Sequence, residues 1–208
     1  MKCEETFRAF VAIEISDEAR KGIAGFQTRL ARVASGTRWV PPRNVHLTLA
    51  FLGDISAETG EGLCRALDEV ASSSSPFSFE VAGTGVFGKR GAPRIVWAGV
   101  RGDVSRLRAL HARLTARLAD LGLRSDDRPF APHLTVARIR DPRRATELVR
   151  KLANWRDASF GHVTVRRVVL MRSVLGPTGA VYSLVHQAPL GEASGEGTAP
   201  PPATEERD

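Results

Sequence analysis

The chain has 208 residues, of which 42% are hydrophobic and 25% charged, and its 30 Lys and Arg against 23 Asp and Glu give a formal net charge of +7. This composition is typical of a globular domain, and no apolar run approaches the roughly 20 residues that a membrane-spanning helix needs. Two cysteines are too few for a disulfide framework, and an N-terminus with Glu4 and Glu5 is unlike a secretory signal. We therefore expect a cytoplasmic protein with reduced thiols and no membrane contact.

Hydrophobic periodicity and turn residues predict helices and strands in alternation. In the first half we expect a strand over 6–15, a helix over 17–34, a strand over 44–52, a helix from 56 and a strand over 77–86. The second half repeats this order, with a strand over 94–100, a helix from 105, a strand at His133, a helix over 141–155 and strands over 163–175 and 180–186. Residues 1–190 are thus predicted to form a single domain with two lobes. Residues 191–208, rich in Gly, Pro, Ala, Ser and Glu, are predicted to be a disordered tail.

One four-residue pattern occurs in both halves, as HLTL from His46 and as HLTV from His133, in a chain with five histidines. In a strand, residues i and i+2 project from the same face. Each copy therefore directs a histidine and a threonine into one space and its two aliphatic residues into a core. The repeat predicts an active site built from two histidines.

A third match, HVTV from His162, lies in a segment rich in β-branched residues, where β-propensity alone can produce the pattern. His46 and His133 each follow a helix of the repeat and a proline-marked entry, whereas His162 precedes a hairpin arm. We therefore expect His162 to take no part in the site. His111 is expected to be a structural residue beside the leucine stripe of its helix, and His186 a surface residue.

The basic charge, with a sequence pI near 10.4, favours a polyanionic partner such as RNA, because cations that bind a polyanion release its condensed counterions. Arginine outnumbers lysine by 26 to 4, however, and codon bias alone can produce such a skew. The charge by itself leaves the nature of the ligand open.

Two facing histidines suit displacement at phosphorus, in which the attacking and leaving oxygens lie roughly in line. An ordinary histidine pKa near 6.5 lets one ring act as a base while the other, protonated, acts as an acid. The hydroxyls of Thr48 and Thr135 can donate hydrogen bonds to the non-bridging oxygens. Arg138 could bind the same oxygens, but strict alternation turns it away from His133 and Thr135 unless the strand bends. The sequence offers no sign of such a bend.

The paired motifs, together with the segments around them, resemble the 2H phosphoesterase superfamily. Within it the likeness is greatest to the RNA 2′,3′-cyclic phosphodiesterase group, first named 2′-5′ RNA ligases. The resemblance covers roughly residues 6–187. The segments that carry it are residues 8–13 (RAFVAI), 39–53 (WVPPRNVHLTLAFLG), 93–97 (PRIVW) and 132–138 (PHLTVAR).

The resemblance implies a bilobal α+β fold in which two pseudo-twofold-related antiparallel sheets, with helices on the outside, enclose a central cleft. It also implies hydrolysis of a terminal RNA 2′,3′-cyclic phosphate to a 2′-phosphate without a metal. We further expect no cofactor and a monomeric protein. By this likeness His46 is the proton donor to the leaving 3′-oxygen and His133 is the base that activates water. The family places an arginine on the phosphate at the position of Arg138.

Two alternatives stay open at this point. The same acid and base could serve the reverse reaction, 2′-5′ ligation of RNA ends, and the fold could also act as a non-catalytic module that binds nucleotides or RNA. Bases could stack on Phe51, Phe130 or Trp39, although we expect all three rings to belong to the core.

Overall fold

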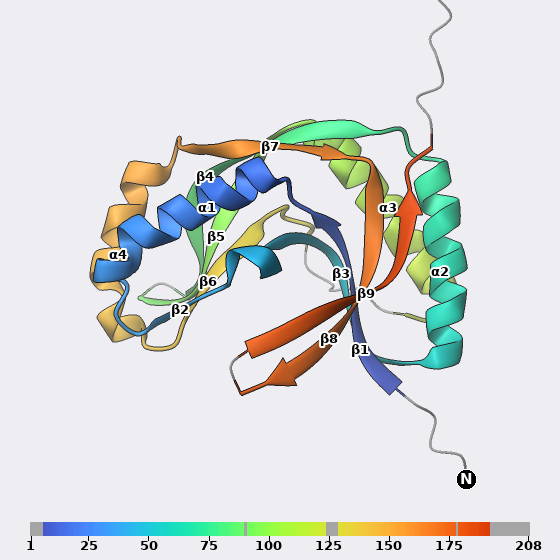
Figure 1. Cartoon of the computed structure of the whole chain (residues 1–208), viewed down its shortest axis with the longest axis horizontal. Coiled ribbons are helices and arrows are strands. Elements are labelled where there is room, and N and C mark those ends of the chain that lie inside the picture. The colour runs from blue at the N-terminus through green and yellow to red at the C-terminus, as the bar shows by residue number, and fades with distance from the viewer. Residues whose placement is uncertain (1–5, 90, 124–128, 178, 192–208) are drawn as a thin grey trace, which may run out of the picture.

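The computed structural model describes residues 6–89, 91–123, 129–177 and 179–191 (Figure 1). The α-helices in these ranges are α1 Asp17–Leu30, α2 Ala57–Ser72, α3 Val104–Asp120 and α4 Thr146–Leu152. The strands are β1 Thr6–Glu14, β2 Thr37–Trp39, β3 His46–Ser56, β4 Phe77–Lys89, β5 Ala92–Gly102, β6 Leu134–Ile139, β7 Ser159–Val165, β8 Arg167–Gly176 and β9 Gly179–Pro189. Short 3-10 helices cover Ala31–Val33, Pro42–Asn44, Pro142–Arg144 and Ala153–Trp155.

The strands form one antiparallel sheet in the order β7-β4-β5-β6-β3-β1-β8-β9, with β2 added to β6. This order divides into two halves of four strands, β7-β4-β5-β6 and β3-β1-β8-β9. The halves meet at β6 and β3, and these two strands carry the motifs: β3 starts at His46, and β6 starts one residue after His133. In the register of the sheet the two halves touch at one residue pair, Leu47 with Leu134. The two predicted antiparallel sheets are therefore present as the halves of a continuous curled sheet, and the α+β fold is confirmed.

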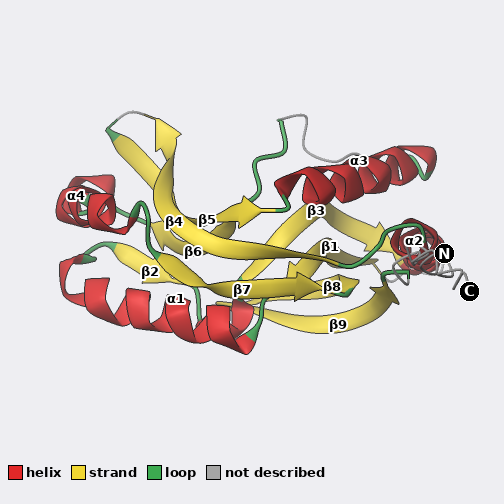
Figure 2. Cartoon of the chain, turned by 90° about the horizontal axis from the view of Figure 1, so that it is seen from above, coloured by secondary structure: helices red, strands yellow, loops and turns green. Residues whose placement is uncertain are grey.

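The helices lie outside the two halves, with α1 and α4 beside the β4 to β7 half and α2 and α3 beside the other (Figure 1). Two of them cross over, since α1 follows β1 yet packs against β7, and α3 follows β5 yet packs against α2. Figure 2 shows α1 and α3 on opposite sides of the strands. Gly22 permits the α1 contact, because a Cβ there would lie 2.2 Å from the backbone oxygen of Phe160.

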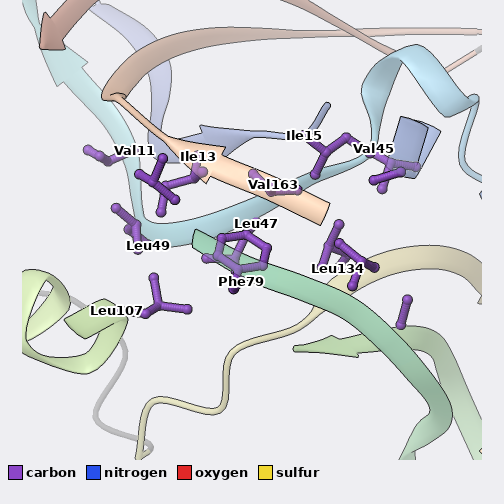
Figure 3. Close-up of a cluster of buried hydrophobic side chains, with 14 of the residues drawn as sticks. Val11, Ile13, Ile15, Val45, Leu47, Leu49, Phe79, Leu107, Leu134 and Val163 are labelled. Atoms are coloured by element: carbon purple, nitrogen blue, oxygen red, sulfur yellow. The ribbon is translucent and has the colours of Figure 1, made fainter. Parts of the chain in front are cut away.

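The aliphatic residues of both motifs lie in the core, as the alternation predicts. Leu47, Leu134 and Val136 are each 0% exposed, and Leu49 is 4% exposed. Figure 3 shows Leu47, Leu49 and Leu134 within one cluster, which also contains Val11, Ile13 and Phe79. Burying a leucine side chain contributes roughly 2 kcal/mol. The buried aliphatic residues therefore fix the orientation of each motif strand, and the histidine and threonine face away from the core.

Two predicted elements are wrong in their continuity. The helix expected over 141–155 consists of a 3-10 turn, the short helix α4 and a second 3-10 turn. The strand expected over 163–175 is two strands, because the chain leaves β7 after Val165 and enters β8 at Arg167 on the far half of the sheet. No described helix is both long and apolar enough to span a membrane. The expected tail, apart from Gly191, lies outside the described residues.

Candidate active site at the junction of two strands

The two motifs meet at the centre of the sheet, where Leu47 of β3 is paired with Leu134 of β6. When this antiparallel register is continued by one residue each way, His46 lies opposite Thr135 and Thr48 lies opposite His133. All four side chains then share the face opposite the core. In a regular ladder the two histidines are diagonal neighbours, and the Cα atoms of such neighbours lie roughly 7–8 Å apart.

His46 is held by one hydrogen bond and two aromatic rings. Its Nδ1 lies 2.8 Å from the backbone oxygen of Asn44. The ring stacks on Phe10, with centroids 4.7 Å apart and an interplanar angle of 23°, and Tyr182 meets it edge-on at 5.4 Å. Because a carbonyl oxygen can only accept, Nδ1 carries the proton of the neutral ring, and Nε2 is left to react.

His133 is held in the same way by its own half of the molecule. Its Nδ1 lies 2.8 Å from the backbone oxygen of Ala131, two residues earlier, as Asn44 is two residues before His46. Phe87 of β4 meets the ring edge-on, with centroids 4.8 Å apart. Both histidines therefore present Nε2 as the reactive nitrogen, and in both the tautomer is set by a backbone carbonyl.

The surroundings of His46 favour its neutral form. Burial lowers the pKa of His46, and the hydrogen bond to the Asn44 carbonyl offsets only part of this effect. In the free protein His46 therefore loses its proton at a lower pH than an ordinary histidine does.

A β-bulge on β6 resolves the position of Arg138. Thr135 is paired with Trp97 of β5, but Ala137 is paired with Val96, so Val136 is an extra residue in β6. Thr135 is partly exposed, Val136 and Ala137 are buried and Arg138 is exposed. The bulge thus turns Arg138 to the same face as Thr135, and this is the bend of which the sequence gives no sign.

A matching bulge on β3 places Phe51 on the site face. Thr48 is paired with Ala12 and Ala50 with Val11, so Leu49 is an extra residue in β3. Phe51, five residues after His46 as Arg138 is five after His133, is 64% exposed. Its assignment to the core is therefore wrong. Phe130 and Trp39 are partly buried and pack against the core, as expected.

Three polar side chains on this face, those of Thr48, Thr135 and Arg138, are available to a ligand. Within the described part of the chain, neither threonine hydroxyl has a hydrogen-bond partner, and Arg138 has no ion pair. Arg38 of β2 is the cross-strand neighbour of Arg138 and adds a second guanidinium at the same edge of the site. Two hydroxyls and the guanidinium of Arg138 beside two histidines are groups of the kind that can bind an anion.

The model of one protein family, the 2′-5′ RNA ligase superfamily, matches residues 13–177. The chain belongs to this superfamily.

Sequence relatives agree with this assignment. A protein of Archaeoglobus fulgidus named RNA 2′,3′-cyclic phosphodiesterase is 35% identical over 175 residues, which cover 84% of this chain and 96% of the relative. A protein of the same name from Geobacillus stearothermophilus is 40% identical over 129 residues, which cover 62% of this chain. The match spans only 41% of the length of that second relative.

Solved structures of similar fold cover nearly the whole described domain. TT0787 of Thermus thermophilus is 31% identical, with a TM-score of 0.76 over 89% of this chain and 100% of that one. E. coli LigT in complex with 3′-AMP is 26% identical, with a TM-score of 0.71 over 89% of this chain and 99% of that one. Both structures therefore share the fold of this chain.

The other three histidines have different surroundings. His111 stacks on Phe130, with centroids 3.8 Å apart, and burial lowers its pKa. His186 bonds to Asp68 through Nε2 at 2.8 Å. His162 is exposed on β7, an edge strand separated from β3 by three strands. The third motif is therefore not brought together with the other two.

Sequence reasoning missed the rings that hold the histidines, because they lie on strands distant in the chain. No local signal identifies Phe10, Phe87 or Tyr182 as neighbours of a histidine. Among the described residues, no group of three or more His, Cys, Asp or Glu side chains is placed to hold a metal ion.

Proposed function

We propose that the protein hydrolyses terminal RNA 2′,3′-cyclic phosphates to 2′-phosphates, with His46 as proton donor and His133 as proton acceptor. The observation that carries this proposal is the junction of the two motifs, where two histidines with fixed tautomers present Nε2 on one face. Relatives that bear the name RNA 2′,3′-cyclic phosphodiesterase support it.

The reaction needs one proton to leave water and one to reach the departing oxygen. In the proposed step, Nε2 of His133 takes a proton from a water molecule while the oxygen of that water forms a bond to phosphorus. The bond from phosphorus to the 3′-oxygen breaks, and Nε2 of His46 delivers a proton to that oxygen. Thr48, Thr135 and Arg138 stabilise the negative charge on the non-bridging oxygens.

The role of His46 as an acid requires that it be protonated when substrate is bound, although burial favours the neutral ring. A bound phosphodiester carries a negative charge beside the ring and favours the protonated form. The charge of the bound substrate thus opposes the effect of burial on the pKa of His46, and we expect His46 to become protonated when the substrate binds.

The nucleoside of the substrate needs an apolar surface near the phosphate. Phe51 offers an exposed ring on the same face as Thr48, and base stacking on an aromatic side chain contributes roughly 1–3 kcal/mol. The relative LigT forms a complex with 3′-AMP, which has the size of one such nucleotide. We propose that the terminal base stacks on Phe51.

The direct test is incubation of the purified protein with adenosine 2′,3′-cyclic phosphate, with and without a chelator. We expect adenosine 2′-phosphate as the product at equal rates in both samples. A 3′-phosphate product would reverse the assignment of the leaving oxygen, and dependence on a metal would contradict the two-histidine mechanism. Binding without conversion would instead identify a binding module.

The reverse reaction and the cellular setting belong to the same proposal. Incubation of an RNA with a 2′,3′-cyclic end and an RNA with a 5′-hydroxyl end measures 2′-5′ ligation, and we expect hydrolysis to dominate at micromolar RNA because water is in large excess.

We also propose that the protein acts as a monomer in the cytoplasm. Sedimentation of the pure protein and localisation of a tagged copy test these two statements.

A further inference from the structure

A cavity of about 270 Å³ opens on the site face next to His46, on the side away from His133. It lies over β1 and β8 and is bordered by β9 and by the 3-10 turn that precedes His46. His46 itself lines the cavity, which extends from the proposed acid over the two neighbouring strands. The reaction proposed above assigns no part of the substrate to the space over β1 and β8.

The floor of the cavity is apolar. Phe10, Ala12 and Val169 form a small cluster separate from the main core, and each is at most 3% exposed. Tyr182 and Met171 are only partly buried and pack against this cluster from the hairpin side. An apolar floor beside an aromatic edge suits a nucleoside, because every base has a face that can stack.

The rim of the cavity is basic. Arg43 is exposed and has no hydrogen bond or ion pair within the described residues. Arg20 also borders the cavity, but its guanidinium is held by Asp17 at 2.6 Å. The one carboxylate on the rim, Glu14, is bonded to Arg167 at 2.8 Å. Arg43 is thus the group available to an incoming phosphate.

The hairpin side of the cavity is fixed in place. Asn44 donates from Nδ2 to the backbone oxygen of Ala180 at 2.9 Å, which ties β9 to the turn that carries Arg43. The same turn supplies the Asn44 carbonyl that holds His46. The cavity and the proposed acid therefore share one rigid support, and a group bound in the cavity keeps a defined position relative to His46.

We infer that this cavity binds the penultimate nucleotide of an RNA end, with Arg43 on the phosphate that joins it to the terminal nucleotide. The inference rests on the proposed function, since it extends the same substrate by one residue. It makes the protein selective for RNA ends of at least two nucleotides over free cyclic nucleotides.

The test compares three substrates that end in the same cyclic phosphate: a cyclic nucleoside phosphate, the same compound with a 5′-phosphate, and a dinucleotide. We expect kcat/KM to rise in that order, because the second substrate reaches Arg43 and the third also fills the apolar floor. Equal values for all three would overturn the inference while leaving the proposed function intact. Failure to hydrolyse any of them would instead remove the proposed function.

Arg43→Gln isolates the phosphate contact. A charge-assisted hydrogen bond to phosphate that is partly exposed corresponds to about a five- to tenfold effect, so the variant should lower the ratio of dinucleotide to cyclic nucleoside kcat/KM by that factor. The dependence of log kcat/KM on log salt for the dinucleotide should become shallower by about 0.7, the value for one phosphate contact on a single strand. Arg108→Gln, which removes an exposed arginine from α3, is the matched control and should leave both ratio and slope unchanged.

Ala180→Leu tests the cavity itself. It narrows the space from the hairpin side and retains the backbone oxygen that Asn44 binds, so the fold is preserved, as a thermal melt can verify. We expect this variant to lose the advantage of the dinucleotide over the 5′-phosphorylated compound. If either Arg43→Gln or Ala180→Leu lowers activity on all three substrates by the same factor, the cavity does not bind the second nucleotide.

Discussion

The two halves of the site share one backbone plan and differ in what they offer a substrate. At the start of both β3 and β6, a histidine and a threonine are followed by a bulge, which turns the residue five positions after the histidine onto the site face. That residue is Phe51 in one half and Arg138 in the other. The same backbone plan thus presents an apolar ring in one half and a cation in the other.

The same difference extends to the histidines. His46 lies between Phe10 and Tyr182, and burial lowers its pKa. His133 has Phe87 at its edge and lies one residue before the start of β6. The repeat thus supplies two equivalent positions on the sheet, while the side chains around each position differ.

The largest effect should come from removing either histidine. His46→Ala and His133→Ala should each lower kcat by roughly 10² to 10⁴-fold, the usual contribution of a general acid or base. His162→Ala changes the histidine of the third motif on β7 and serves as the control, with no expected loss. Steady-state rates on a 2′,3′-cyclic nucleotide measure all three, and a loss in His162→Ala similar to the other two would mean that the wrong pair is assigned.

A substrate with sulfur in place of the bridging 3′-oxygen separates the two roles. A thiol has a pKa near 8.5 and leaves as the thiolate, so it needs little help from an acid. We expect this substrate to restore much of the rate to His46→Ala and almost none to His133→Ala. If the substrate instead restored the rate of His133→Ala and not that of His46→Ala, His133 would be the acid and His46 the base.

The next effect concerns the two residues that the bulges present. Arg138→Ala should lower kcat about 10²-fold, in the range found when one donor to developing charge is removed, and should weaken inhibition by inorganic phosphate. Phe51→Ala should lower kcat/KM about tenfold through lost stacking and leave phosphate inhibition unchanged. Equal effects of the two variants on phosphate inhibition would contradict the assignment of the phosphate contact to Arg138 and of base stacking to Phe51.

The sequence predicts much of this arrangement, because strand alternation is a local property. Leu47 and Leu134 had to face a core, and so His46 and His133 had to face away from it. The position of Arg138 could not be predicted, since the bulge at Val136 depends on pairing with β5 and not on the residues of β6 alone. The same holds for Phe51.

The breaks in predicted elements have a similar cause. Between β7 and β8 the chain turns at Arg166 without a glycine or proline, so no turn signal marks it. In the segment over 141–155, the completely buried Ala145 ends the first turn and packs in the core. Tertiary contacts, and not local preferences, decide both breaks.

The smallest predicted effect is on stability, and it tests the buried state of His46. Its folded pKa lies below the ordinary value near 6.5, so the unfolded chain binds this proton more tightly. The stabilising contribution is therefore complete above about pH 6.5 and is lost as the pH falls toward the folded pKa. His46→Gln should show a smaller loss of unfolding free energy on acidification than the wild type, as measured by urea denaturation at several pH values.

A phosphate bound between His46 and His133 should reduce the loss of unfolding free energy at low pH. An anion between the rings favours protonated His46, so binding of a nucleoside 2′-phosphate is accompanied by proton uptake and becomes tighter as the pH falls toward the lowered pKa of His46 in the free protein. The rise of the melting temperature with added nucleotide should therefore be larger at about pH 5.5 than at about pH 7.5 in the wild type. That difference should shrink in His46→Gln, and its persistence would mean that the proton is bound elsewhere than on the ring that Phe10 and Tyr182 enclose.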